Sequence, residues 1–335
     1  MPFAHTAPGT AATLLSFGSD WLYVLLTGGA LLGIGALLAL RGTSSAARHP
    51  LRAYMQGAAA VLGLPRWSAG PILVLIAGCV YAVGGFFWDV GWHIAVGRDE
   101  FLFSPPHLCL LIGIGLLGLA GLAATVAATR DRAGAGWGIG RVRVPYGAGA
   151  LLATGVVAGV GFGVDELWHW AYGLDVSMWS PPHLSMISAA AFSPMAGWLL
   201  LAEAGPGAGR KVPRYLLVSL FTGATLVGLS AWQLEFDMGV PQWRQAFHPL
   251  LVGVAGAFAL CAARAALGPG GAMLGMARFV LIRVGLALLT TQVWHLPEPR
   301  FVPYLAAALA VEAAFALTRR AAPPRAAVVA GVGVA

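Results

Sequence analysis

The chain has 335 residues, of which 59% are hydrophobic and only 10% are charged. A soluble domain carries roughly a quarter charged residues, so this composition excludes an ordinary soluble enzyme and predicts a multi-pass membrane protein. The net charge of +7 comes from arginines in short segments between apolar runs. Their distribution indicates membrane topology and does not indicate nucleic-acid binding.

Nine apolar runs follow one another along the chain. The first, roughly Trp21 to Leu40, is long enough to cross a hydrocarbon core of about 30 Å. The others lie at about 70–92, 107–128, 147–170, 183–203, 215–236, 248–267, 272–295 and 302–318. Glycine and alanine are abundant in all of them, which suits close helix packing in lipid. We therefore predict an all-α fold, a polytopic membrane helix bundle of about nine helices that forms one transmembrane domain over residues 1–335.

Positive charge is concentrated in alternate connections between these runs. The basic residues there and in the tail are Arg41, Arg48, Arg52, Arg66, Arg130, Arg132, Arg141, Arg143, Arg210, Lys211, Arg214, Arg264, Arg319, Arg320 and Arg325. The intervening loops are nearly neutral or acidic. By the positive-inside rule, the N-terminus is expected outside and the C-terminus inside a plasma membrane.

One stretch of the chain occurs twice. It reads DVGWHIAVGRDEFLFSPPHL from Asp89 to Leu108 and DELWHWAYGLDVSMWSPPHL from Asp165 to Leu184, 76 residues further on. Both copies keep Asp-x-x-Trp-His and a later Ser-Pro-Pro-His. With the apolar runs on either side, we predict an internal repeat of two helix hairpins over 70–128 and 147–203.

Each copy holds a carboxylate and two histidines at a spacing suited to a metal. An aspartate and a histidine at i, i+4 leave the same face of a helix. Ser-Pro-Pro predicts the start of the next helix, with the second histidine in its first turn. The predicted ligands are Asp89, His93 and His107 in the first copy and Asp165, His169 and His183 in the second. Such a set suits copper, zinc or iron and leaves one coordination position open. By the predicted topology both sets lie on the extracytoplasmic side.

Other polar residues at the same membrane level are weaker candidates. Asp99 and Asp175, in the loops of the two copies, either orient an imidazole or are solvated loop charges. Four residues further along the chain either belong to decayed copies of the motif or are ordinary interface residues: Glu235, Asp237, His248 and His295.

The aromatic and sulfur-containing residues favour structural roles. Tryptophans near the motif fit an aromatic belt at the membrane interface, namely Trp88, Trp92, Trp168, Trp170 and Trp179. The cysteines lie in apolar runs at no metal-binding spacing, which is typical of small buried hydrophobic residues: Cys79, Cys109 and Cys261.

The first copy resembles the metal-binding stretch in a membrane-embedded subunit of the copper membrane monooxygenases, the family of particulate methane, ammonia and short-chain hydrocarbon monooxygenases. The matching residues are Asp89, Trp92, His93, Arg98, Asp99, Pro105 and His107, with one extra residue in the loop before the last histidine. Asp165, His169 and His183 fall where the family has an Asn-His-His set, so a carboxylate replaces the amide. The resemblance covers about 89–190.

This resemblance implies a copper-binding membrane protein that oxidises a small apolar or N–H substrate with O2 at the outer membrane face. The first ligand set would hold the copper that activates oxygen, and the second set a further copper in the same centre or in an accessory store. Other monooxygenase-type subunits, or further copies of the chain, are the implied partners.

Two other functional classes compete with this interpretation. A non-catalytic copper or zinc transporter, chaperone or sensor would also use repeated sites on one face, although transport needs ligands within the membrane and the candidates there are few. The charged residues Arg283 and Glu312 lie near the inner side by the predicted topology, where they either pair or snorkel. Haem held by histidine pairs is a weaker alternative, because it leaves Asp89 and Asp165 without a role.

Overall fold

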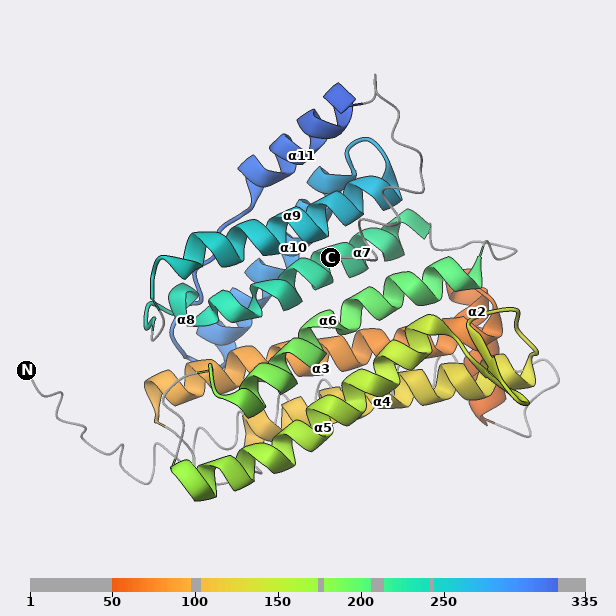
Figure 1. The fold of residues 1–335 in the computed structure, drawn as a ribbon, viewed down its shortest axis with the longest axis horizontal. Helices are drawn as coiled ribbons and strands as arrows, with labels where there is room; N and C mark the ends of the chain where they lie inside the picture. Colours follow the sequence, from red (N-terminus) through yellow and green to blue (C-terminus); the bar gives the residue numbers. More distant parts are fainter. Residues whose placement is uncertain (1–49, 98–103, 174–177, 206–213, 242–243, 319–335) are drawn as a thin grey trace, which may run out of the picture.

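The computed structural model describes residues 50–97, 104–173, 178–205, 214–241 and 244–318. These residues form a bundle of long helices with one small β-hairpin (Figure 1). In chain order the elements are α2 (Pro50–Leu62), α3 (Arg66–Ala95), α4 (Pro105–Arg130), β1 (Trp137–Ile139), β2 (Val142–Val144), α5 (Tyr146–Tyr172), α6 (Pro181–Ala204), α7 (Arg214–Leu229), the 3₁₀ turn η1 (Ser230–Gln233), α8 (Leu234–Asp237), α9 (Phe247–Leu267), α10 (Gly271–Leu288), the π-helical turn η2 (Leu289–Val293) and α11 (Leu305–Thr318). The predicted span at 21–40 lies outside the described residues.

Seven helical segments of the described chain are long and apolar enough to cross a membrane. They are Arg66–Ala95, Pro105–Arg130, Tyr146–Tyr172, Pro181–Ala204, Arg214–Asp237, Phe247–Leu267 and Gly271–Val293. Each coincides with one predicted run, so the multi-pass helical membrane fold is confirmed. The run predicted at 302–318 forms α11, whose 14 residues extend about 21 Å, less than a hydrocarbon core of about 30 Å. The total of nine spans stays a prediction.

Two elements lie in connections for which the sequence predicts only loops. In α2, the Tyr54 hydroxyl donates a hydrogen bond to the carbonyl of Gly70 in α3 (3.1 Å). Strands β1 and β2 pair antiparallel around Gly140, whose φ of +59° favours glycine. The Arg143 amide of β2 donates to the hydroxyl of Thr129 at the end of α4 (2.9 Å). The strands have only three residues each, too few to show a hydrophobic period, so their contact with α4 decides them.

The two repeat copies fold as the hairpins α3–α4 and α5–α6, and each closes on a glycine at the matching position. A Cβ added at Gly85 of α3 would lie 2.8 Å from the amide nitrogen of Leu110 in α4. A Cβ added at Gly161 of α5 would lie 2.3 Å from Cγ of Met186 in α6. A larger residue at Gly85 would meet the backbone of α4 and push the two helices apart, whereas a larger residue at Gly161 would first displace the Met186 side chain.

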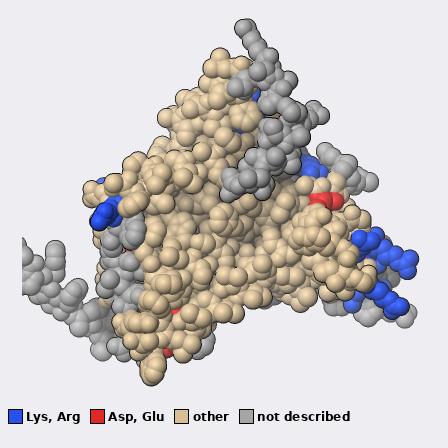
Figure 2. Space-filling model, in the orientation of Figure 1, with Lys and Arg blue, Asp and Glu red and all other residues tan. Residues whose placement is uncertain are grey.

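The repeated motif and the basic loops lie at opposite ends of the bundle. The motif occupies the C-terminal ends of α3 and α5 and the N-terminal ends of α4 and α6. Arg66 begins α3 and Arg130 ends α4, with the β-hairpin beyond them. Figure 2 shows basic side chains gathered at this second end, where Figure 1 places α2 and the hairpin. The alternation of helix directions therefore puts both ligand sets at the same end of the bundle.

Candidate metal centres

The first ligand set lies where α3 ends and α4 begins. Asp89 and His93 stand one turn apart near the end of α3, and His107 stands in the first turn of α4, after the N-cap residue Ser104. Nε2 of His107 is 3.1 Å from Oδ1 of Asp89, and Nδ1 of His93 is 3.7 Å from Oδ2. The side chains of Asp89, His93 and His107 are only 13%, 25% and 18% exposed. The predicted local geometry thus brings the three ligands together.

The second set repeats this arrangement where α5 ends and α6 begins. Oδ2 of Asp165 lies 3.4 Å from Nε2 of His183 and 3.7 Å from Nε2 of His169. The imidazole planes of His169 and His183 meet at 73° with ring centroids 6.1 Å apart. The corresponding values for His93 and His107 are 72° and 5.9 Å. The two sets therefore share the relative placement of their imidazole rings as well as the spacing along the chain, but they differ in the facing atoms: the histidines of the first set approach different oxygens of Asp89, whereas both histidines of the second set approach Oδ2 of Asp165.

Both sets fit a three-ligand metal site. Ligand atoms bound tetrahedrally at about 2.1 Å from a metal lie about 3.4 Å apart, and the nitrogen–oxygen distances here run from 3.1 to 3.7 Å. In each set, one possible ligand atom from every residue lies within 4.8 Å of the others. Oδ1 of Asp165 is buried and has no hydrogen-bond partner in the described part of the chain. A buried carboxylate oxygen in this position is favourable when a cation binds it.

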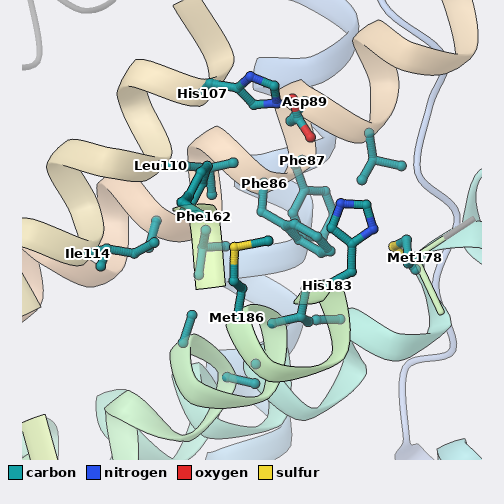
Figure 3. Close-up of a pocket in the computed structure, with 18 of the residues that line it drawn as sticks. Phe86, Phe87, Asp89, His107, Leu110, Ile114, Phe162, Met178, His183 and Met186 are labelled. Atoms are coloured by element: carbon teal, nitrogen blue, oxygen red, sulfur yellow. Dashed lines mark ion pairs between the residues drawn. The ribbon is translucent and has the colours of Figure 1, made fainter. Parts of the chain in front are cut away.

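Both ligand sets open onto one cavity of about 680 Å³ among α3, α4, α5, α6 and α7. All six predicted ligands line it. Figure 3 shows Asp89, His107 and His183 around this space, with the apolar side chains of Phe86, Phe162 and Met186 beside them. Two motifs far apart in the sequence therefore share one potential reaction space.

The apolar lining also follows the repeat. Positions 76 residues apart line the cavity in pairs, namely Phe86 with Phe162, Leu110 with Met186, and Ile114 with Ala190. The ring of Phe162 meets the ring of His107 edge to face, with centroids 6.3 Å apart. Each copy thus supplies both ligands and wall, and the aromatic wall of α5 contacts a ligand carried by α4.

Two further carboxylates line the cavity. Glu235, a weaker candidate from the sequence, accepts a hydrogen bond from the amide of Met178 (3.0 Å). Glu166 was not predicted from the sequence. Its counterpart in the first copy is Val90, so a comparison of the two copies does not single out Glu166. The feature that could have indicated Glu166 is its position directly after the predicted ligand Asp165.

Three other weaker candidates, Asp237, His248 and His295, are described by the structure and do not belong to the cavity lining. Asp237 is buried and accepts a 2.7 Å hydrogen bond from Nη2 of Arg283. The ring of His248 stacks on Phe236, with centroids 4.7 Å apart. His295 follows η2 with a φ of +54°. Asp99 and Asp175 lie outside the described residues, so their proposed role stays a prediction.

One tryptophan departs from the predicted aromatic belt. Trp88 is fully buried and stacks on Trp294 with centroids 5.1 Å apart and planes at 4°. Trp170, in contrast, is 88% exposed. The belt prediction is wrong for Trp88, because the side chain next to Asp89 packs into the bundle. Cys79 also has a position that the sequence did not suggest, since it lines the cavity.

The fold and the two sites define a multi-pass membrane protein with two candidate metal centres on one internal cavity. No family model matches the chain, and no curated protein or solved structure matches it. A functional assignment therefore depends on the chemistry of the site itself.

Proposed function

We propose that this chain is a copper-dependent membrane monooxygenase, or the metal-site subunit of one, that oxidises a small apolar or N–H substrate with O2. The observation that carries the proposal is the shared cavity, where two Asp-His-His sets meet an apolar wall. The resemblance of residues 89–190 to the membrane-embedded metal-binding stretch of the copper membrane monooxygenases supports the same assignment. We place the sites on the extracytoplasmic side of the plasma membrane, because the basic loops lie at the other end of the bundle.

The donor set determines which metal chemistry is possible. One carboxylate and two imidazoles suit copper, with zinc or iron as alternatives, and leave a coordination position for substrate or oxygen. Copper bound there would supply the activation of O2. The carboxylates of Asp89 and Asp165 would offset the charge of the cation, which is costly to hold at the edge of a membrane without such a partner.

The protein side chains have distinct parts in the reaction. Phe86 and Phe162 form walls that hold an apolar substrate and exclude water. Insertion of one oxygen atom converts a C–H bond to C–OH, and the second oxygen atom leaves as water after two electrons and two protons are delivered. Glu166 and Glu235 line the same cavity and are placed to pass those protons. The electrons require an external two-electron donor of the quinol class, so we propose partner subunits or a homo-oligomer that provide its docking site.

Metal analysis of matched variants tests the proposal. The protein purified from copper-replete cells should carry one copper per ligand set. His93→Ala with His107→Ala should remove one of them, and His169→Ala with His183→Ala the other. His248→Ala is the control, since its ring stacks on Phe236 away from the cavity. Copper content that neither double variant changes would refute the assignment.

Proteoliposomes separate this function from metal transport. The two charged residues that the sequence offered for a conduit are both engaged, Arg283 with Asp237 and Glu312 with Arg264. We therefore expect copper to stay bound and an oxidised product to form when O2 and a reductant are supplied. Accumulation of metal inside the vesicles without product would instead favour the transporter.

A further inference from the structure

From the ligand sets the cavity extends between α3 and α6 toward the basic end of the bundle, which is the direction called below. On α3 its lining continues from Asp89 through Phe86 to Cys79, and on α6 from His183 to Pro194. Asp89 and Cys79 are ten residues apart, which corresponds to about 15 Å along a helix. The space is therefore a slot with the ligands at one end and a mostly apolar interior.

An asymmetry between the two repeat copies leaves this slot open. Where α4 carries Ile114, the matching position of α6 carries Ala190. Where α4 carries Leu117, which is fully buried, α6 carries Ser193. The second copy thus has smaller side chains at two successive depths below its ligands. These substitutions make room on the α6 side that the α4 side lacks.

The far end of the slot is a built feature of α6. Pro194 has no N–H, so the carbonyl of Ala190 loses its helical partner. The hydroxyl of Ser193 donates to that carbonyl at 2.8 Å. Oγ of Ser193 also lies 3.8 Å from Sγ of Cys79 across the slot. This pair closes the space between α3 and α6 at the depth of Pro194.

The size of the slot is suited to a long molecule and not to a gas. A molecule of one heavy atom fills about the 30 Å³ of a water in liquid, a small part of a cavity of about 680 Å³. Carbons joined by bonds of about 1.5 Å advance about 1.3 Å each in an extended chain. A slot of about 15 Å therefore takes a linear chain on the order of ten carbons.

We propose that the cavity binds a linear alkyl chain of about ten carbons, with one end at the ligand sets and the other at Cys79 and Ser193. The assignment of this chain as the substrate rests on the proposed oxygenase function, whereas the binding itself does not. A free alkyl compound is the occupant to which we commit, because the described lining carries the carboxylates of Asp89, Asp165, Glu166 and Glu235 and no Lys or Arg, so it offers no partner to the phosphate of a phospholipid headgroup.

Photolabelling with probes of graded length tests the proposal. The full chain in lipid nanodiscs receives n-alkanes that carry a terminal diazirine, from butyl to tetradecyl length, at one fixed ratio of probe to lipid. Labelled residues are mapped by mass spectrometry. Labelling at the depth of Cys79 and Ser193 should rise up to the decyl or dodecyl probe and fall for tetradecyl. A profile that is highest for butyl would overturn the proposal.

A parallel phospholipid probe, with the diazirine at the end of an acyl chain, identifies the source of the alkyl chain. Stronger labelling of the slot by the free alkyl probe supports the proposal. Labelling of the slot by the phospholipid alone would overturn it and mark the slot as a lipid site.

Variants that restore the residues of the first copy should shorten the slot in a predictable order. Ala190→Ile blocks the slot about 10 Å below His183, so the preferred alkyl chain should become three to four carbons shorter. Labelling by the decyl probe should fall about tenfold, which is the scale of the cost of overpacking a filled apolar site. Ser193→Leu lies deeper and should shorten the preferred chain by less. The matched control is Ala202→Ile, on the exposed face of the same helix. An unchanged length profile in both slot variants would contradict the proposal.

Copper content separates failure of this inference from failure of the proposed function. Ala190→Ile leaves all six ligands in place and should keep its copper. A length optimum in a protein that binds no copper would leave the alkyl site standing and refute the oxygenase. Copper binding without a length optimum would do the reverse.

Discussion

The ion pair between Arg283 and Asp237 offers a sharp test of how this bundle tolerates charge. The Arg283 side chain is 0% exposed and that of Asp237 only 5%, with 2.7 Å between Nη2 and Oδ2. The guanidinium also lies over the rings of Phe87 and Phe301, at 4.8 and 5.1 Å from their centroids. Asp237→Ala would leave a buried positive charge with aromatic faces and one backbone carbonyl, that of Arg300.

The expected cost follows from the asymmetry of buried ion pairs. Removing one partner of such a pair costs about 3–5 kcal/mol, because the remaining charge is uncompensated. Cation–π contacts are worth about 2 kcal/mol or more each when desolvated, but they are present before and after the change and so do not offset the loss. Against a total stability of about 5–15 kcal/mol, this is a large loss. Replacing both partners with apolar residues of similar volume is often neutral.

Equilibrium unfolding in mixed detergent micelles measures these differences. We expect Asp237→Ala to lose about 3–5 kcal/mol and Asp237→Ala with Arg283→Met to recover most of it. Arg283→Met alone should fall between the two. If Asp237→Ala cost less than about 1 kcal/mol, or if the double variant were less stable than the single one, the charge would not be as isolated as the burial indicates.

Three further predictions concern metal and helix ends. Asp165→Ala should weaken copper binding at the second set by at least the roughly tenfold to hundredfold that partners of metal ligands contribute, while the first set keeps its copper in equilibrium dialysis. Chelation should lower the stability of the copper-loaded protein by about 2.7 kcal/mol for each ligand set if copper is at a hundredfold excess over its Kd, and His169→Ala with His183→Ala should halve the total difference in thermal unfolding. Glu312→Ala should cost about 2 kcal/mol, measured by unfolding, because its carboxylate accepts hydrogen bonds from Arg264 and from two amides at the start of α10; a change near zero would show that water replaces them.

The local parts of the site are those that the sequence could predict. Asp89 and His93 are separated by one helical turn, and Ser-Pro-Pro specifies where the next helix starts, so the meeting with His107 depends on short-range geometry. The same reasoning holds for the second copy. One short-range expectation was wrong: Ser104 and Ser180 occupy the N-cap positions, but their hydroxyls make no capping hydrogen bond.

The side-chain positions that the sequence did not indicate depend on contacts across the bundle. Trp88 was expected at the membrane interface and is buried against Trp294, more than two hundred positions further along the chain. Asp237 was a weak metal candidate and is paired with Arg283. Each outcome depends on which side of a helix faces a neighbour, and helices in lipid are apolar on both their lipid-facing and their protein-facing sides.

The sequence by itself determined that the chain crosses a membrane several times as helices and that it carries two Asp-His-His sets at helix-hairpin ends. Composition and spacing are enough for this, because the hydrophobic length of a span and the i, i+4 geometry are properties of single segments. Only the tertiary structure decided that both sets open onto one cavity and that the cavity continues between α3 and α6. The rotation of each helix about its axis depends on close contacts such as that of Gly85 with the backbone of α4, and no apolar period in the sequence encodes that rotation.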